Sequence, residues 1–316
     1  MVTPAPDVGA GFWSERPGFV QRLGLSASFT LCVGLAAVGF TGFLATSEIL
    51  APAEASWPDA HPFGAAGQDP EPTTAEAPLT DTGGDPLLDN ALYEVGELGE
   101  VTCGAPELAP DDPASTEGFA HAIADCLDQA WSAYFTEAGL EFSSPNRVYW
   151  YAEGHSPCGP FPKEDTAAFY CQANQGLYLG VEDIVEASAG TDRPEAYTFL
   201  LSHEYGHHVQ GQSRVLAEFR SDRAAADPET ADELTRRNEL QADCLGGVFL
   251  GASGTSLDLG ARERANILDD VARRSDHGAE RTHGQASSAR LWTEHGMDRR
   301  DPAACNTWKA NGELVR

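Results

Sequence analysis

Lysine is nearly absent from this sequence of 316 residues: 20 lysines and arginines together face 49 acidic residues, and the formal net charge is −29. Nucleic acids and anionic lipid surfaces repel so acidic a chain, which excludes them as binding partners of its surface. The seven cysteines include no Cys-x-x-Cys pair of the kind that binds zinc. Because 41% of the residues are hydrophobic, the chain can nevertheless bury a sizeable core.

The scarce basic residues leave a long gap near the N-terminus. No lysine or arginine lies between Arg22 and Arg147, and residues 23–47 carry no charge of either sign. An apolar stretch of about 20 residues can span a bilayer, and basic residues stay on the cytoplasmic side. We therefore predict a cytoplasmic N-terminus (1–22), a single-pass transmembrane signal anchor (23–47) in the cell membrane, and an extracytoplasmic remainder. A cleaved signal peptide is the alternative, although its apolar core is usually only about 7–15 residues long.

Composition divides the remainder into a linker and a folded domain. Residues 48–89 are rich in proline, alanine, glycine and acids, which predicts an extended, self-repelling linker. Residues 90–316 regain aromatic residues and are long enough for a folded domain. Within it, the spacing of apolar residues predicts a strand at 147–152, a hairpin of 168–171 with 176–181, and helices at 115–138, 194–212, 229–251, 258–275 and 284–296. The predicted fold class is α+β, dominated by helices and with a small sheet.

Six of the seven cysteines follow the predicted anchor, and only Cys32 lies within it. An even number of cysteines in an oxidising compartment favours disulfide bonds, although six cysteines allow 15 pairings. Buried free thiols are the alternative. We predict sequential pairing, which gives Cys103–Cys126, Cys158–Cys171 and Cys244–Cys305.

The main chemical signal lies in the predicted helix over 194–212. The segment His203-Glu204-Tyr-Gly-His207 has the spacing His-Glu-x-x-His. Residues four apart share one face of a helix, so both imidazoles can bind one zinc ion. Glu204 is then the candidate catalytic base that takes a proton from the attacking water. The alternative is a helix that carries two surface histidines.

A second acidic pair lies in the predicted helix over 229–251, where Glu239 and Asp243 are one turn apart. A catalytic zinc needs three protein ligands and one open position. We therefore predict Glu239 as the third ligand. Asp243 is predicted to accept the free N–H of a ligating histidine and so to orient that ring. Without the upstream motif, the pair would indicate only a solvated acidic face.

Together these two motifs resemble those of the putative neutral zinc metallopeptidases, membrane-anchored bacterial proteins of zincin type. The resemblance covers about residues 90–310. Further matching segments are Ser156–Gly159, Pro160-Phe161, Phe169–Cys171, Tyr178-Leu179, Thr282–Gly284, Arg290, Trp292 and Cys305–Thr307. The resemblance implies a zincin-like fold, one zinc ion bound by His203, His207 and Glu239, and Glu204 as base. This chain departs from the usual family pattern at Gln172, Asn174 and Gly180, where the family has a proline and two acids.

His283 is a further candidate. An imidazole near the metal could stabilise the oxyanion that forms when a carbonyl is attacked. The alternative is a capping or surface histidine.

The sequence thus predicts a membrane-anchored zinc metallopeptidase that hydrolyses a peptide or protein substrate outside the cell. Zinc suits two imidazoles and one carboxylate best among common metals. A zinc-stabilised extracytoplasmic binding module without catalytic activity is the alternative. Hydrolysis of a non-peptide amide is a third possibility that the same site could support.

Overall fold

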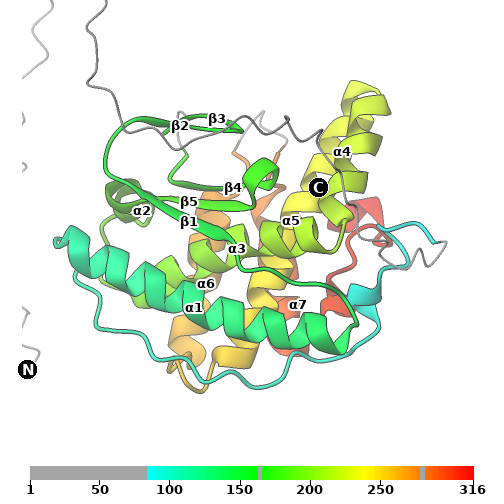
Figure 1. The fold of residues 1–316 in the computed structure, drawn as a ribbon. Helices are drawn as coiled ribbons and strands as arrows, with labels where there is room; N and C mark the ends of the chain where they lie inside the picture. Colours follow the sequence, from blue (N-terminus) through cyan, green and yellow to red (C-terminus); the bar gives the residue numbers. More distant parts are fainter. Residues whose placement is uncertain (1–83, 163–165, 278–281) are drawn as a thin grey trace, which may run out of the picture. The chain divides into compact units, whose positions relative to one another are not determined.

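The computed structural model describes residues 84–162, 166–277 and 282–316 (Figure 1). The chain divides into two units at residues 71 and 72, and the described residues belong to the second. The predicted cytoplasmic segment, the predicted anchor at 23–47 and nearly all of the predicted linker lie outside the described residues. Within the described part, no helix is both long and apolar enough to cross a membrane.

Helices dominate the described part, as the sequence predicts. They are α1 (Pro113–Glu137), α2 (Val181–Ala187), α3 (Pro194–Gln212), α4 (Val215–Ala225), α5 (Pro228–Ser253), α6 (Ala261–Arg274) and α7 (Ala286–Arg299). Five of them were predicted within a few residues of these bounds. Helices α2 and α4 were not predicted, because α2 is only seven residues long and α4 has too few apolar residues to show a helical period.

The two longest helices begin in the same way. Asp112 precedes α1 and Asp227 precedes α5, and each carboxylate accepts a hydrogen bond from a backbone N–H of the first turn. A proline follows each aspartate. Its fixed φ suits the first position of a helix, and its missing N–H needs no partner there. These local signals place the start of α5, which carries Glu239 and Asp243.

The strands form one three-stranded sheet and one short hairpin. They are β1 (Asn146–Trp150), β2 (Gly154–Ser156), β3 (Gly159–Phe161), β4 (Ala168–Cys171) and β5 (Gly176–Gly180). In the larger sheet the order is β1-β5-β4, with β5 parallel to β1 and antiparallel to β4. The predicted hairpin is therefore confirmed, and β4 is an edge strand that lies against α3. The β2–β3 hairpin was not predicted.

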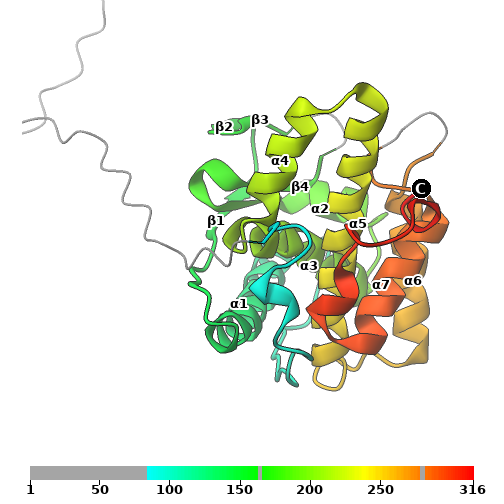
Figure 2. The ribbon, with the colours of Figure 1, turned by 90° about the vertical axis from the view of Figure 1, so that its right-hand side faces the viewer.

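Close helix packing places α3 beside α5, and α5 beside α7 (Figure 2). Gly206 of α3 lies against the backbone of α5, where a Cβ atom would come within 2.8 Å of the Ala242 carbonyl oxygen. Gly296 of α7 lies similarly close to the Cys244 carbonyl. Because glycine has no side chain, the α3 and α5 backbones can approach each other closely. This approach brings the face of α3 that carries the histidines near Glu239.

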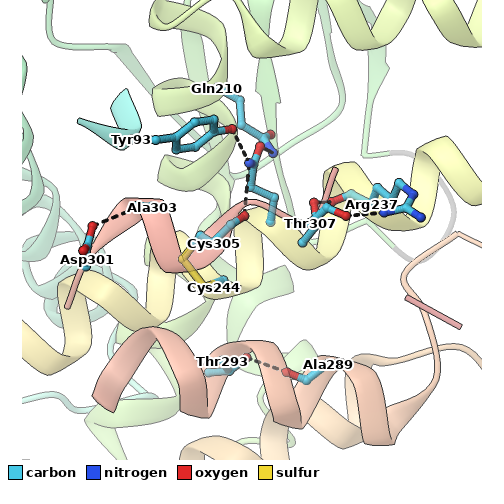
Figure 3. The surroundings of a disulfide bond; sticks show 11 residues. Tyr93, Gln210, Arg237, Cys244, Ala289, Thr293, Asp301, Ala303, Cys305 and Thr307 are labelled. Carbon is cyan, nitrogen blue, oxygen red and sulfur yellow. Dashed lines mark hydrogen bonds between the residues drawn. A yellow bond between two sulfur atoms is a disulfide. The ribbon is translucent and has the colours of Figure 1, made fainter. Parts of the chain in front are cut away.

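The three predicted disulfide bonds are confirmed, with Cα–Cα separations of 5.6 Å for Cys103–Cys126, 5.8 Å for Cys158–Cys171 and 5.4 Å for Cys244–Cys305. The third bond fastens α5 to the C-terminal 3₁₀ helix Pro302–Cys305 (Figure 3). It lies one residue after Asp243, and so next to the predicted metal site.

Candidate metal centre

The three predicted ligands come together in space. His203 and His207 lie one turn apart on α3, and Glu239 faces them from α5. One potential donor atom of each residue lies within 4.8 Å of the other two. The Nε2 atoms of His203 and His207 are 3.4 Å and 3.2 Å from the same oxygen, Glu239 Oε2. The two imidazole rings are nearly perpendicular, with an interplanar angle of 87°.

The other nitrogen of each imidazole has its own acceptor. His203 Nδ1 lies 2.8 Å from Asp243 Oδ1, and His207 Nδ1 lies 2.8 Å from Gln210 Oε1. An oxygen that can only accept requires Nδ1 to carry the hydrogen. In the neutral rings, both Nε2 atoms are then left with a free lone pair toward Glu239. This is the tautomer that a metal ion needs.

The prediction for Asp243 thus agrees with its position, whereas the role of Gln210 was not predicted. A usable signal was present, because Gln210 lies three residues after His207, and residues at that spacing are neighbours on a helix. The Gln210 amide nitrogen donates to the Asn238 carbonyl at 2.8 Å and to Gln241 Oε1 at 3.0 Å. These bonds fix which end of the amide faces His207.

Gln241 continues this chain of amides toward the disulfide bond. Its Nε2 donates to the Tyr93 hydroxyl at 2.8 Å and to the Cys305 carbonyl at 3.2 Å. Figure 3 shows Tyr93 and Gln210 beside the Cys244–Cys305 bond. A continuous line of hydrogen bonds therefore runs from His207 through Gln210 and Gln241 to Cys305.

The side chains of His203, His207 and Glu239 influence one another's charge. Burial alone would lower the pKa of His203, but hydrogen bonds to Asp243 and Glu239 outweigh it and leave that pKa well above its usual value. Burial would likewise lower the pKa of His207, and the charge of Glu239 outweighs it to raise that pKa. Burial would raise the pKa of Glu239, but the two histidines hold it well below its usual range. The buried carboxylates thus favour positive charge at the imidazoles, and a divalent cation can supply that charge in place of protons.

The geometry and the chemistry of these residues fit a zinc ion. Two imidazole nitrogens and one carboxylate oxygen converge, each imidazole is held by a hydrogen bond at its far nitrogen, and the donor set is one that catalytic zinc uses. A site with three protein ligands also leaves a position for water or substrate.

Glu204 is adjacent in sequence to the first histidine, and it lines a cavity. Its side chain is buried, at 8% exposure, yet it lines two cavities that also include His203. It makes no hydrogen bond or ion pair with the residues that the structure describes. Its carboxylate is therefore free to accept a proton from a molecule in the cavity.

The two cavities form the halves of one cleft. Their volumes are about 320 Å³ and about 300 Å³. Both are lined by Thr166 and Ala168 beside β4, by His203 and Glu204 of α3, and by His283. The candidate metal centre thus lies at the middle of a cleft that passes between the edge of the sheet and the helices.

His283 lies on the rim of this cleft, with its side chain 54% exposed. The buried Asp276 carboxylate accepts the backbone N–H groups of His283 and Gly284 at 2.9 Å and 2.8 Å. The backbone position of His283 is therefore fixed, while its ring contacts the Thr282 hydroxyl. His283 makes no hydrogen bond to the three candidate ligands in the described part of the chain.

Fold and site together define a helical protein with a candidate three-ligand metal centre, in which an acid follows the first histidine. The chain matches the family described as putative neutral zinc metallopeptidase over residues 102–308 and belongs to that family. It is 27% identical to the Escherichia coli K12 uncharacterized protein YpfJ over 215 residues, which cover 64% of this chain and 74% of the relative. It is 29% identical to the Mycobacterium tuberculosis H37Rv uncharacterized protein Rv2575 over 177 residues, which cover 48% of this chain and 58% of the relative. No solved structure matches the chain.

Proposed function

We propose that the protein is a zinc-dependent metallopeptidase that hydrolyses peptide bonds. The observation that supports this most directly is the convergence of both imidazole Nε2 atoms on Glu239, with the unbonded Glu204 carboxylate beside them. His203, His207 and Glu239 would hold one zinc ion. Membership of the zinc metallopeptidase family supports the same interpretation of the site.

Zinc bound there would lower the pKa of a coordinated water toward 7 and polarise the scissile carbonyl. The chain's own residues would do the rest. Glu204 takes the proton of the attacking water and passes it to the leaving amine. Asp243 and Gln210 hold the two ligating rings in one tautomer and orientation. His283, on the cleft rim, donates a hydrogen bond to the negative charge that develops on the carbonyl oxygen.

We also propose that this domain, residues 90–316, works outside the membrane and is tethered by the segments at 23–47 and 48–89. Three disulfide bonds support an oxidising compartment. The asymmetry of basic residues around 23–47 supports the orientation. A protease-protection assay on intact cells tests the proposal, and protection of the domain in intact cells would contradict it.

Two variants test the enzymatic function. Glu239→Ala is expected to lose zinc in metal analysis of the purified protein, because one of three ligands is removed. Glu204→Gln is expected to keep zinc and lose at least about 100-fold in peptide cleavage, the contribution of a general base. A binding module would instead keep its behaviour in Glu204→Gln. Failure of the zinc-loaded wild type to cleave any member of a peptide library, against a chelator-treated control, would contradict the peptidase function.

A further inference from the structure

The two ends of the cleft differ in chemistry. We call the cavity that includes Val271, Arg274 and Ser275 the α6 end, and the cavity that includes Leu216, Phe219 and Arg220 the α4 end. Each end contains an arginine. The difference between them lies in what each arginine already binds.

The arginine of the α6 end is neutralised by the protein. Arg274 Nε lies 2.7 Å from Asp270 Oδ2, and the Asp270 side chain is only 6% exposed. Arg273 pairs with the same carboxylate. A substrate carboxylate at this end would have to compete with a buried aspartate that is already bound.

The arginine of the α4 end has no such partner. Arg220 is exposed, and no carboxylate of the described residues lies within 4.0 Å of its guanidinium. Its position on α4 explains this. The helical neighbours three and four residues away are Leu216, Ala217, Arg223 and Ala224, none of which is acidic. The acids of α4, Glu218 and Asp222, are two residues away and point to other faces.

Most arginines in the described part pair with a carboxylate, as expected in a chain whose acids far outnumber its bases. The paired ones are Arg147, Arg237, Arg262, Arg264, Arg273, Arg274, Arg290, Arg300 and Arg316. Arg220 lines the same cavity as Glu204 and Glu239, which would repel an acidic ligand. A positive group on this wall is therefore what an acidic substrate would need.

We propose that Arg220 binds a carboxylate of the substrate, so that the enzyme prefers peptides with an acidic residue on the α4 side of the scissile bond. This inference rests on the proposed peptidase function and names its substrate class. Arginine suits the role because its planar guanidinium can hold a carboxylate by two parallel hydrogen bonds.

The test compares peptides that differ at one position. A peptide library cleaved by the zinc-loaded protein first identifies a substrate, and glutamate, glutamine or lysine is then placed in turn at each position beside the scissile bond. We expect the wild type to favour glutamate over glutamine by roughly two- to fivefold in kcat/KM on one side of the bond, a factor typical of a solvent-accessible ion pair. Arg220→Ala should abolish or reverse that preference, since Glu204 and Glu239 remain. Arg220→Glu should favour lysine.

Arg223→Ala is the matched control. Arg223 lies one turn further along α4, and its Nε donates to the Thr235 hydroxyl at 2.8 Å. Because it does not line the cleft, its loss should leave the glutamate preference unchanged. A glutamate preference that survives in Arg220→Ala, or is absent from the wild type, would overturn the proposal.

A binding measurement separates this inference from the peptidase proposal. Fluorescent peptide pools that differ only in glutamate against glutamine are titrated into the zinc-loaded Glu204→Gln variant, with and without the additional Arg220→Ala substitution. Tighter binding of the glutamate pool that is lost with Arg220→Ala supports the acidic subsite even if no peptide is cleaved. Equal binding of both pools refutes the subsite whether or not cleavage occurs.

Discussion

At the residue scale, the two histidines of the candidate metal centre, His203 and His207, are held by different kinds of acceptor. Asp243 can carry a charge, while Gln210 is neutral and depends on its own bonds to Asn238 and Gln241 for orientation. A charged acceptor attracts the proton of an imidazole more strongly than an amide does. We therefore expect Gln210 to support metal binding mainly by orienting the His207 ring. Its effect on metal affinity should not depend on a charge, unlike that of Asp243.

Replacement of Gln210 should weaken zinc binding without removing a ligand. Gln210→Ala takes away the acceptor of His207 Nδ1, and we expect zinc affinity to fall by about 10- to 100-fold, as for other groups that orient a ligand. Competition with a chromophoric chelator measures this. Gln129→Ala is the control, because Gln129 is an exposed residue of α1 that lies far along the chain from the motif. Unchanged affinity in Gln210→Ala would contradict the assigned role.

His208 neighbours the site but belongs to the core. Its Nε2 donates to the Ser143 carbonyl at 2.8 Å, while its buried Nδ1 has no hydrogen-bond partner in the described part. The ring lies edge-on against Tyr170 and Tyr205. Burial lowers the pKa of His208 to about 4, because a second proton would have no acceptor there.

The low pKa of His208 predicts acid sensitivity. Below about pH 6.5, the ordinary pKa of histidine, His208 binds a proton in the unfolded chain but not in the folded chain. The free energy of unfolding therefore falls as the pH drops from about 6.5 toward 4. The full loss is about 3 kcal/mol. His208→Gln lacks this titration. In urea unfolding with chelator present, the stability advantage of the wild type at pH 7.5 should shrink as the pH approaches 4.5. A constant difference across this range would refute the prediction.

At the scale of elements, the contact between α3 and α5 decides whether a third ligand is available. Gly206 lies between His203 and His207 in sequence and abuts Ala242, which lies three residues after Glu239. Any side chain at this point would push the helices apart. The glycine therefore links helix packing directly to ligand geometry.

A single methyl group at Gly206 should disturb both stability and the metal site. We expect Gly206→Ala to lower stability by about 1–3 kcal/mol through overpacking, and to weaken zinc binding because Glu239 moves with α5. Gly118→Ala is a matched control, since Gly118 is a helical glycine of α1 with nothing within 4 Å of an added Cβ. That change should be neutral or stabilising. Thermal unfolding and chelator competition on both variants decide the matter.

The elements that could be predicted from the sequence carry strong local signals, and the others do not. α3 and α5 begin at a proline, and the motif spacing itself presumes a helix, so His203, His207, Glu239 and Asp243 could be placed together in advance. α4 has only Val215, Leu216 and Phe219 as buried residues, too few to predict a helix. Arg220 was therefore not placed beside the cleft. The amide chain through Gln241 depends on tertiary contacts to Tyr93 and Cys305, which no local pattern predicts.

At the scale of the whole molecule, the Cys244–Cys305 disulfide bond connects the C-terminal segment to the residues that orient His203 and His207. Cys244 follows Asp243, the acceptor of His203, while the Cys305 carbonyl accepts from Gln241, which holds Gln210. The bond closes a separation of 61 residues. In the chain-entropy description such a loop stabilises the folded state by about 4 kcal/mol.

Removal of the Cys244–Cys305 bond should therefore lower both the stability of the protein and its affinity for zinc. Removal of the Cys103–Cys126 bond should lower stability alone. The Cys244→Ala, Cys305→Ala double variant is expected to lower stability by up to about 4 kcal/mol and zinc affinity by at least about tenfold. The control is Cys103→Ala with Cys126→Ala, a bond across 23 residues that fastens α1 and makes no contact with the amide chain. It should lower stability by up to about 3 kcal/mol and leave zinc affinity unchanged. Zinc affinity measured below the unfolding range of each variant distinguishes the two. Equal losses of zinc affinity in both would show that general destabilisation, and not the connection through Gln241 and Asp243, controls the metal site.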